Sequence, residues 1–468
     1  MANYSQLEYK QEKDIKPHSL RQAGHSEWSV LWFSLLIFGL TLAGYAIHSV
    51  FLLLAFLMIM KEILVPRYPG AEAIPFVLIV SWGAEIWSGV DMKLYTLIRI
   101  VCVSCILLRG GTFRKFNLFH LLCLVFGAYM LIGGVAAGYL SLSGVVNLTL
   151  CYFTIYQLIS GRSRRLYLDL SLAYALGVFF SAVLFWCGPV FPRLGVIVDS
   201  MIETTNIYGA QKLTRLSGMT YDPNMFAHYI LVGISAMMCV INVMDVRGKG
   251  IYYVMLAVLS LLGLLTLSKT FMLIFVLLAF LWVISFLHNC KISAWKKAGF
   301  VLMLLLAAAV MMPLMSTYVH AILERFRDGR ASGDLTTGRS RIWGQYLEIL
   351  GSHLGLLLFG TSPFAPMPGH SPHNFIIYMV YCFGLIGSFL FCMMIGYLIH
   401  IRKFVLKKRW IWYFMPGIMY LVFSMSVDPF MLYDAKLAMI TVAAFPVKWL
   451  DSECARRTAP RGRRLRRS

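Results

Sequence analysis

The sequence predicts an all-α polytopic membrane protein. Hydrophobic residues make up 59% of the chain and charged residues only 13%, whereas soluble domains carry roughly 25% charged residues. The mean hydropathy is +0.73. Apolar runs of about 18 to 25 residues, each long enough to cross a bilayer as a helix, recur along the chain. Together these observations exclude an ordinary soluble domain.

We expect about 12 to 14 membrane-spanning helices, with the first pair open to a different division around Gly44. Residues 1–28 are predicted to form a polar cytoplasmic segment, because no early apolar region marks a signal peptide. Residues 29–450 form a single integral membrane domain, and residues 451–468 form a basic cytoplasmic tail. The expected spans are 29–46, 47–64, 73–91, 93–109, 116–138, 143–160, 166–188, 225–244, 250–267, 270–288, 297–315, 374–400, 410–426 and 432–449.

Basic residues determine the expected orientation. The net charge of +21 is concentrated in short segments between the spans and in the C-terminal tail. When the chain is followed span by span, these segments all fall on one side, which is the cytoplasmic side by the positive-inside rule. A lipid bilayer therefore explains the charge, and we expect no nucleic-acid partner. The segments are 114–117, 161–165, 246–250, 291–297, 401–409 and 451–468.

Two long segments, 189–224 and 316–372, then fall on the outer side. The second is a large loop that we expect to be helical, because Ile342, Tyr346 and Ile349 recur at helical spacing within 340–350. Trp343, Leu347 and Leu350 widen that apolar stripe. This loop precedes a His373-Asn374 pair that opens an apolar run.

Several polar residues near these outer segments have an ordinary structural explanation. Asp222-Pro223-Asn224 is typical of a helix start, as is Asn374 after His373. Arg215 could be a surface arginine near lipid headgroups, and Arg339 and Arg341 could be solvated loop charges. Lys269 could extend its amine to the headgroups. Cys102 and Cys105 form a lone CxxC with no second ligand pair, so we expect no metal site.

As a set, however, these residues favour chemistry on a lipid-linked diphosphate. Arginine binds phosphate oxygens through two parallel N–H donors and stays charged at any relevant pH. Histidine can accept a proton from an attacking hydroxyl near pH 7. The chain has no close carboxylate pair of the kind used in glycoside hydrolysis and no nucleotide-binding glycine motif.

At these residues the chain resembles the O-antigen ligase and O-antigen polymerase superfamily of bacterial polysaccharide enzymes. The resemblance covers roughly residues 210–400, with each stretch degenerate alone and the order and spacing carrying the match. The chain departs from the family pattern in three respects. Lys269 stands where the family often has arginine, and residues 348–360 lack the usual proline after the histidine. The fourteen expected spans also exceed the dozen common in ligases. The matching stretches are "RLSGMTYDPN", "LTLSKT", "GRSRIWGQYLEIL" with "LFG", and "HNFIIYMVYCFGLIG".

The resemblance implies a GT-C-like glycosyltransferase architecture in the bacterial inner membrane. It implies transfer of a glycan from an undecaprenyl-diphosphate carrier to a glycan or lipid acceptor on the outer side, without nucleotide or metal. Arg215 and Arg339 would bind the diphosphate and His373 would activate the acceptor hydroxyl. Further substrate contacts would come from Arg341, Lys269, Asn374 and Asn224. Other polysaccharide-assembly membrane proteins are possible partners.

Two alternatives belong to other classes. A transporter or flippase of lipid-linked saccharides would need a buried charge near the membrane midplane, and the predicted spans offer no convincing one. A non-catalytic scaffold would hold Arg215, Arg339 and His373 far apart. Within the transferase interpretation, the sequence does not distinguish a polymerase from a ligase.

Overall fold

The computed structural model shows a bundle of α-helices. The only β-structure in the described part of the chain is a ladder of two-residue strands, β1 (Ile207–Tyr208) and β2 (Leu213–Thr214), paired antiparallel. The structure describes residues 18–83, 85–88, 94–110, 116–160, 163–201, 207–208, 213–220, 222–243, 249–288, 293–295, 297–299, 301–302, 316–317, 320, 323–324, 327, 339–399, 411–426 and 434–458.

Among those residues, seven helices are long and apolar enough to cross a membrane. They are α2 (His18–Ala46), α7 (Leu118–Ala136), α8 (Leu142–Ile159), α9 (Arg164–Cys187), α11 (Pro223–Val243), α13 (Lys269–Leu287) and α17 (Phe375–Ile399). The prediction of a multi-pass helical membrane protein is therefore confirmed. Within its spanning window, α13 is only 17% buried, and so large an exposed apolar surface suits lipid rather than water.

The remaining helices are shorter, apart from the last, and complete the bundle. They are α3 (Val50–Leu64), α4 (Ala73–Trp82), α5 (Glu85–Ser88), α6 (Leu94–Gly110), the 3-10 turn η2 (Gly188–Val190), α10 (Pro192–Met201), α12 (Gly250–Leu265), α15 (Arg339–Ser352), α16 (Leu354–Phe359), α18 (Ile411–Ser424) and α19 (Asp434–Thr458). The helical loop predicted over 340–350 is confirmed by α15. The span predicted at 297–315 lies largely outside the described residues.

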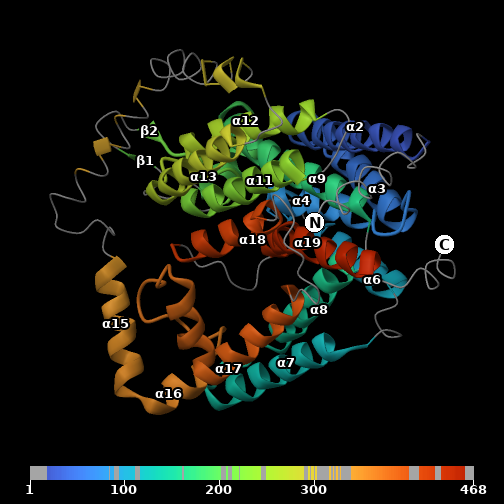
Figure 1. Ribbon diagram of the computed structural model, residues 1–468. Helices are drawn as coiled ribbons and strands as arrows, with labels where there is room; N and C mark the ends of the chain where they lie inside the picture. Colours follow the sequence, from blue (N-terminus) through green and yellow to red (C-terminus); the bar gives the residue numbers. More distant parts are fainter. Residues whose placement is uncertain are drawn as a thin grey trace.

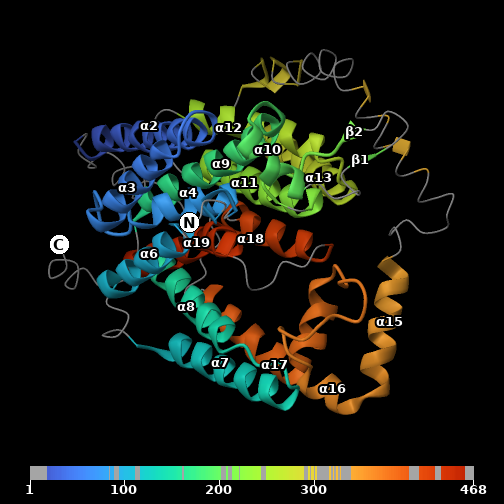
Figure 2. The same ribbon diagram turned by 180° about the vertical axis from the view of Figure 1, so that it is seen from behind.

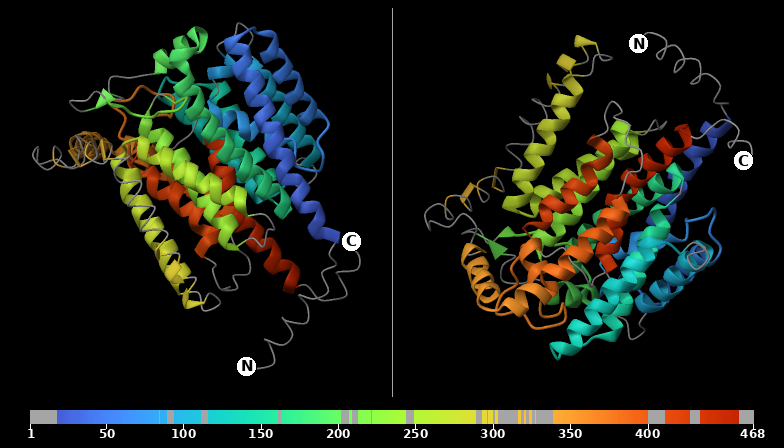
Figure 3. Two further views of the ribbon diagram at one scale, coloured as in Figure 1. Left: turned by 90° about the horizontal axis from the view of Figure 1, so that it is seen from above. Right: turned by 60° about the horizontal axis from the view of Figure 1, so that its bottom comes forward.

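The helices form two packed groups (Figure 1). The larger group places α4 against α9, and α11 among α9, α12 and α18. The smaller group contains α7, α8 and α17, with α15 and α16 beside them, and it joins the larger one where α8 packs on α6 and α19. Figure 2 shows the same two groups from behind. In Figures 1 and 3, β1, β2 and α15 lie on one side of the molecule, and the last turns of α19 point toward the other.

The span predicted at 73–91 is wrong as a single helix. α4 ends after ten residues, all of them buried, and Gly83 follows with φ 113°. A β-carbon at Gly83 would lie 2.6 Å from the carbonyl oxygen of Met219. The chain therefore turns where it meets another segment of backbone, although its composition alone would allow a longer helix.

The span predicted at 374–400 is also interrupted. α17 contains a non-helical residue, Gly384, with φ 62° and ψ −177°. The hydroxyl of Tyr129 on α7 lies 2.8 Å from the carbonyl oxygen of Phe383 and 2.9 Å from that of Phe359, and the amide of Thr361 donates to the carbonyl oxygen of Tyr381 at 2.9 Å. Polar groups freed at a helix break need such partners inside a membrane.

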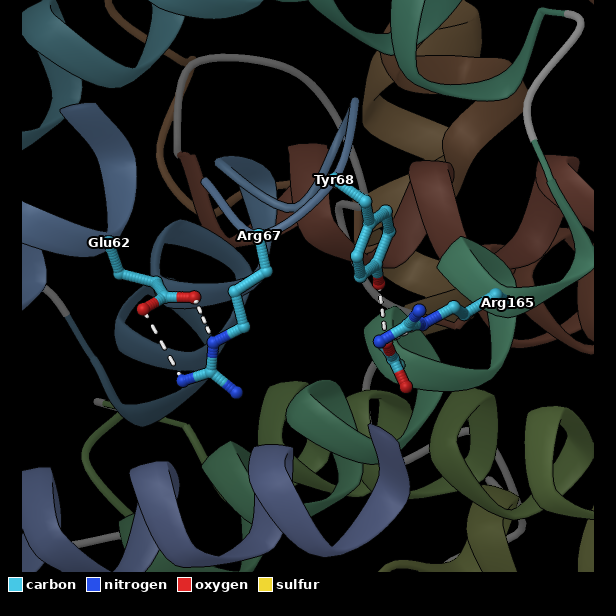
Figure 4. Close-up of polar contacts among 5 residues, drawn as sticks. Glu62, Arg67, Tyr68 and Arg165 are labelled. Carbon is cyan, nitrogen blue, oxygen red and sulfur yellow. Dashed lines mark hydrogen bonds and ion pairs between the residues drawn. The ribbon is translucent and has the colours of Figure 1, made fainter. Parts of the chain in front are cut away.

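Polar side chains also join α3 and the turn that follows it to the start of α9 (Figure 4). Glu62 and Arg67 form an ion pair, with 2.7 Å between Oε1 and Nε. The hydroxyl of Tyr68 donates a hydrogen bond to the buried carboxylate of Asp169, and the guanidinium of Arg165 lies 4.4 Å from the centre of the Tyr68 ring. These contacts fix the turn between α3 and α4 against the start of α9.

Candidate functional site

Arg215 follows β2 and is buried, with 3% of its surface exposed. Its Nε donates to the carbonyl oxygen of Thr266 at 3.0 Å, and its Nη2 donates to Oδ1 of Asn224 at 3.2 Å. The alternative of a surface arginine near lipid headgroups is therefore wrong. The cation is held inside the protein by two contacts from different elements.

Asn224 connects this cation to an acid. Pro223 is the first residue of α11, and Asp222 precedes it, as the sequence pattern predicts for a helix start. The carboxylate of Asp222 accepts from the backbone amide of Asn224 at 2.8 Å and from its side-chain amide at 3.1 Å. The amide side chain thus donates to a carboxylate and accepts from a guanidinium, two charge-assisted hydrogen bonds that fix its orientation.

The turn between α12 and α13 is the other partner of Arg215. The last carbonyls of a helix have no partner within it. Here the carbonyl oxygen of Leu265 accepts from the amide of Leu216 at 3.0 Å, while that of Thr266 accepts from Arg215. A cation at a helix C-terminus is favoured by the helix dipole. Part of the role of Arg215 is therefore to cap α12.

Lys269 lies on the same turn. It is the first residue of α13, three positions after Thr266, and is half-buried. Leu267 between them has φ 52°, and such a backbone at a leucine costs about 1 to 2 kcal/mol. We refer to Arg215, Asp222, Asn224, Thr266 and Lys269 as the Arg215 group. It contains three of the predicted site residues.

The segment that carries Arg215 packs inside the helix bundle. Residues 215–219 are all buried. The amide of Met219 donates to Oγ of Ser181 on α9 at 2.8 Å. Gly218 has φ 54°, and a β-carbon there would overlap the ring of Phe226. Within the segment 189–224, these residues therefore pack among α4, α9 and α11, and the outer location of the segment stays a prediction.

His373 lies at the mouth of α17. Asn374 is buried and starts the helix, because its Oδ1 accepts from the amides of Ile376 at 3.0 Å and Ile377 at 3.2 Å. The prediction that Asn374 starts this helix is confirmed. His373 itself is half-buried and has φ 45°. This left-handed backbone sets the direction in which its imidazole leaves the chain.

Helix α15 fixes the loop that leads to His373. The indole Nε1 of Trp343 donates to the carbonyl oxygen of Pro372 at 2.7 Å, and the hydroxyl of Tyr346 donates to that of His370 at 3.0 Å. The ring of Tyr346 also meets Tyr381 of α17 edge-on, with centroids 5.0 Å apart. Two donors on one turn of α15 therefore determine the position of the residues just before His373.

Arg339 is the first residue of α15 and is half-buried, whereas Arg341 is exposed. Residues four apart on a helix lie on the same face, so Arg339 shares a face with Trp343, whose indole contacts the residue before His373. We refer to Arg339, Trp343, Tyr346, His373 and Asn374 as the His373 group. Trp343 and Tyr346 were predicted only as members of an apolar stripe. Their polar atoms, on a helix beside a proline-rich loop, are the signal that could have identified them.

The two groups occur at the same side of the protein. β1 and β2 lead into Arg215, and α15 begins with Arg339; in Figures 1 and 3 both elements lie on the side away from the last turns of α19. Comparison with known proteins finds no matching family model, no similar curated protein and no similar solved structure. Any functional assignment therefore depends on the geometry of these two groups.

Proposed function

We propose that the protein is a glycosyltransferase of the O-antigen ligase or polymerase type, with a GT-C-like architecture. It would move a glycan from an undecaprenyl-diphosphate carrier to an acceptor hydroxyl at the outer face of the bacterial cytoplasmic membrane. The observation that carries this proposal is the hydrogen bond between Trp343 and Pro372. It joins the helix that begins with Arg339 to the residue before His373, so a phosphate-binding side chain and a proton acceptor share one framework.

In the proposed reaction the acceptor hydroxyl oxygen attacks the anomeric carbon of the donor sugar. The bond between that carbon and the diphosphate oxygen breaks, and its electron pair leaves on the diphosphate. His373 takes the hydroxyl proton as the new glycosidic bond forms. Arg215 and Arg339 stabilise the charge that develops on the leaving group, which is where preorganised donors act most strongly.

The remaining predicted residues take supporting roles in this proposal. Asn224 holds the guanidinium of Arg215 through its 3.2 Å hydrogen bond. Lys269 adds positive charge beside it as a point charge without the arginine fork. Asn374 starts the helix that presents His373, and Arg341, which is exposed, would contact donor or acceptor sugars. A lipid-linked glycan donor and a glycan or lipid acceptor are the proposed partners.

A transporter or flippase of lipid-linked saccharides is the second candidate. The interruption of α17 at Gly384 and the short α4 favour it, because broken helices are common at transport sites. The buried carboxyl groups of Glu72 and Asp169 lie beside the start of α4 and in the second turn of α9, which places them near helix ends. Such positions suit structural pairing better than a midplane transport site.

Reconstitution separates the two candidates. Purified protein in vesicles would be supplied with an undecaprenyl-diphosphate-linked glycan and an acceptor, and both glycan transfer and free undecaprenyl diphosphate would be measured. The transferase proposal expects both products from the wild type and only a small residual fraction of each from His373→Ala. Movement of the intact donor to a lectin-accessible leaflet, without release of the diphosphate, would instead establish the flippase.

A further inference from the structure

The backbone at His373 adopts a conformation that its own sequence does not favour. Its φ of 45° is left-handed, where a residue with a side chain is uncommon. Such a conformation persists only when the surrounding structure determines it from more than one direction. The contacts that impose it lie on both sides of His373.

On the C-terminal side the contact is local. Asn374 is fixed as the start of α17 by its hydrogen bonds to the amides of Ile376 and Ile377. This accounts for the peptide after His373. It does not account for the peptide before it, because a helix start accepts more than one approach of the incoming chain.

On the N-terminal side the contact comes from α15. The carbonyl oxygen of Pro372 belongs to the peptide that enters His373, and Nε1 of Trp343 donates to it at 2.7 Å. Pro372 has a fixed φ of its own. Once its carbonyl is held, the remaining freedom of the peptide plane before His373 is small. Tyr346 holds the loop two residues further back, through the carbonyl oxygen of His370.

We propose that Trp343 is a positioning residue: its indole N–H holds the Pro372 peptide, keeps His373 in the left-handed conformation, and so aims the imidazole at the acceptor hydroxyl. The inference rests on the proposed function and adds to it a residue that touches no reacting atom. Because Arg339 lies one turn before Trp343 on α15, the same hydrogen bond keeps the diphosphate-binding arginine and the base in one rigid unit.

Four variants test the inference in the full-length protein. Trp343→Phe keeps an aromatic ring and removes the N–H, while Tyr346→Phe removes the hydrogen bond to His370. Leu347→Ala changes an exposed residue, 59% accessible, on the same helix and serves as the matched control. His373→Ala supplies a background in which there is no imidazole to aim. For each single variant, kcat and the KM for the lipid-linked donor are measured.

Trp343→Phe is expected to lower kcat by about 10- to 100-fold, since a small misplacement of a reacting group can cost that much. The donor KM should change less than about twofold because Arg339 remains in place. In the His373→Ala background, Trp343→Phe should have no further effect on residual transfer. An equal loss in both backgrounds would mean that the residue is merely structural, and would overturn the inference.

A second measurement separates this inference from the function on which it rests. Amide exchange over residues 370–378 should be faster in Trp343→Phe than in Leu347→Ala, with Tyr346→Phe in between. If the wild type transfers no glycan, the transferase proposal fails, and the contact has no catalytic role. Faster exchange in Trp343→Phe would still show that the Trp343 hydrogen bond holds the loop before His373. Unchanged exchange in Trp343→Phe would show that Trp343 does not hold the Pro372 peptide, and would overturn the inference whatever the measured rate of transfer.

Discussion

The guanidinium Nε of Arg215 lies 3.0 Å from the carbonyl oxygen of Thr266. The same contact therefore caps helix α12 and fixes the orientation of a buried cation. Arg215 is also proposed to bind the diphosphate, so its substitution should change both the stability of the fold and the rate of glycan transfer. Predictions that separate the two effects follow from the contacts around it and around His373.

Arg215→Lys should lower both the stability of the protein and its rate of glycan transfer. The lysine keeps the charge but has no planar fork, so it cannot donate to Thr266 and Asn224 together. We expect glycan transfer to fall by about 100-fold, the equivalent of roughly 3 kcal/mol in the barrier. Arg193→Lys, on the exposed surface of α10, is the matched control and should retain activity. If Arg215→Lys transferred glycan at the wild-type rate, Arg215 would have no role in the reaction.

His373→Gly should abolish glycan transfer while leaving the stability of the protein nearly unchanged. Glycine adopts φ 45° without steric cost, so the free energy of unfolding should change by less than about 1 kcal/mol or rise slightly. Transfer should be lost because the imidazole is gone. Thermal unfolding in detergent and the transfer assay measure the two quantities on one preparation. A strongly destabilised His373→Gly would show that the ring, not the backbone, is what the fold needs here.

Gly384→Ala should destabilise the smaller helix group. The residue has φ 62°, and a β-carbon there would overlap the carbonyl of Leu358 in α16. The cost should exceed about 2 kcal/mol, because the atoms it would meet are backbone and cannot rotate away. Gly396→Ala, on the same helix, should not destabilise the protein, because a β-carbon there would meet no atom within 4 Å beyond its own stretch of helix. Equal melting temperatures for the two variants would contradict the close approach of α16 and α17.

Tyr68→Phe should weaken the fold without affecting transfer, since Tyr68 lies in the turn between α3 and α4 and contacts the start of α9, outside both groups. Burial and then the neighbouring Asp169 carboxylate raise the pKa of Tyr68 above its usual value of 10.0, so the hydroxyl stays protonated and donates. Its removal leaves the buried carboxylate without that donor, which should cost about 1 to 3 kcal/mol.

The same pKa shift predicts a pH dependence. Because the folded protein raises the pKa of Tyr68, its contribution to stability is complete below pH 10 and is lost as the pH rises above the ordinary value. Wild-type protein should therefore lose stability more steeply than Tyr68→Phe as the pH rises above 10. Parallel losses in the two proteins would indicate that this hydroxyl does not control the alkaline transition.

Hydropathy predicted most of the helices, because a span must be apolar over its whole length. It did not predict where they break. α4 stops at Gly83 and α17 is interrupted at Gly384 because each glycine meets backbone from a distant segment, Met219 in one case and Leu358 in the other. Contacts of this kind depend on tertiary packing, so the hydropathy of the surrounding segment does not predict them.

The candidate site shows the same division. Local patterns correctly identified Asp222, Pro223 and Asn224 at the start of α11 and Asn374 at the start of α17. They could not reveal that Arg215 is buried, because its partner Thr266 lies 51 positions away. Trp343 was assigned to an apolar stripe, and the use of its N–H depends on a loop 29 residues later.

The buried stretch at 215–219 also has a consequence for how the protein is made. Its neighbours α4 and α9 are synthesised before it, and α11 after it. Ser181 and Gly83 precede the stretch in the chain, but Phe226, which packs against Gly218, comes only with α11. Its burial is therefore complete only after α11 has been made and inserted. The Arg215 group is finished later still, because Thr266 and Lys269 follow α12 in the chain.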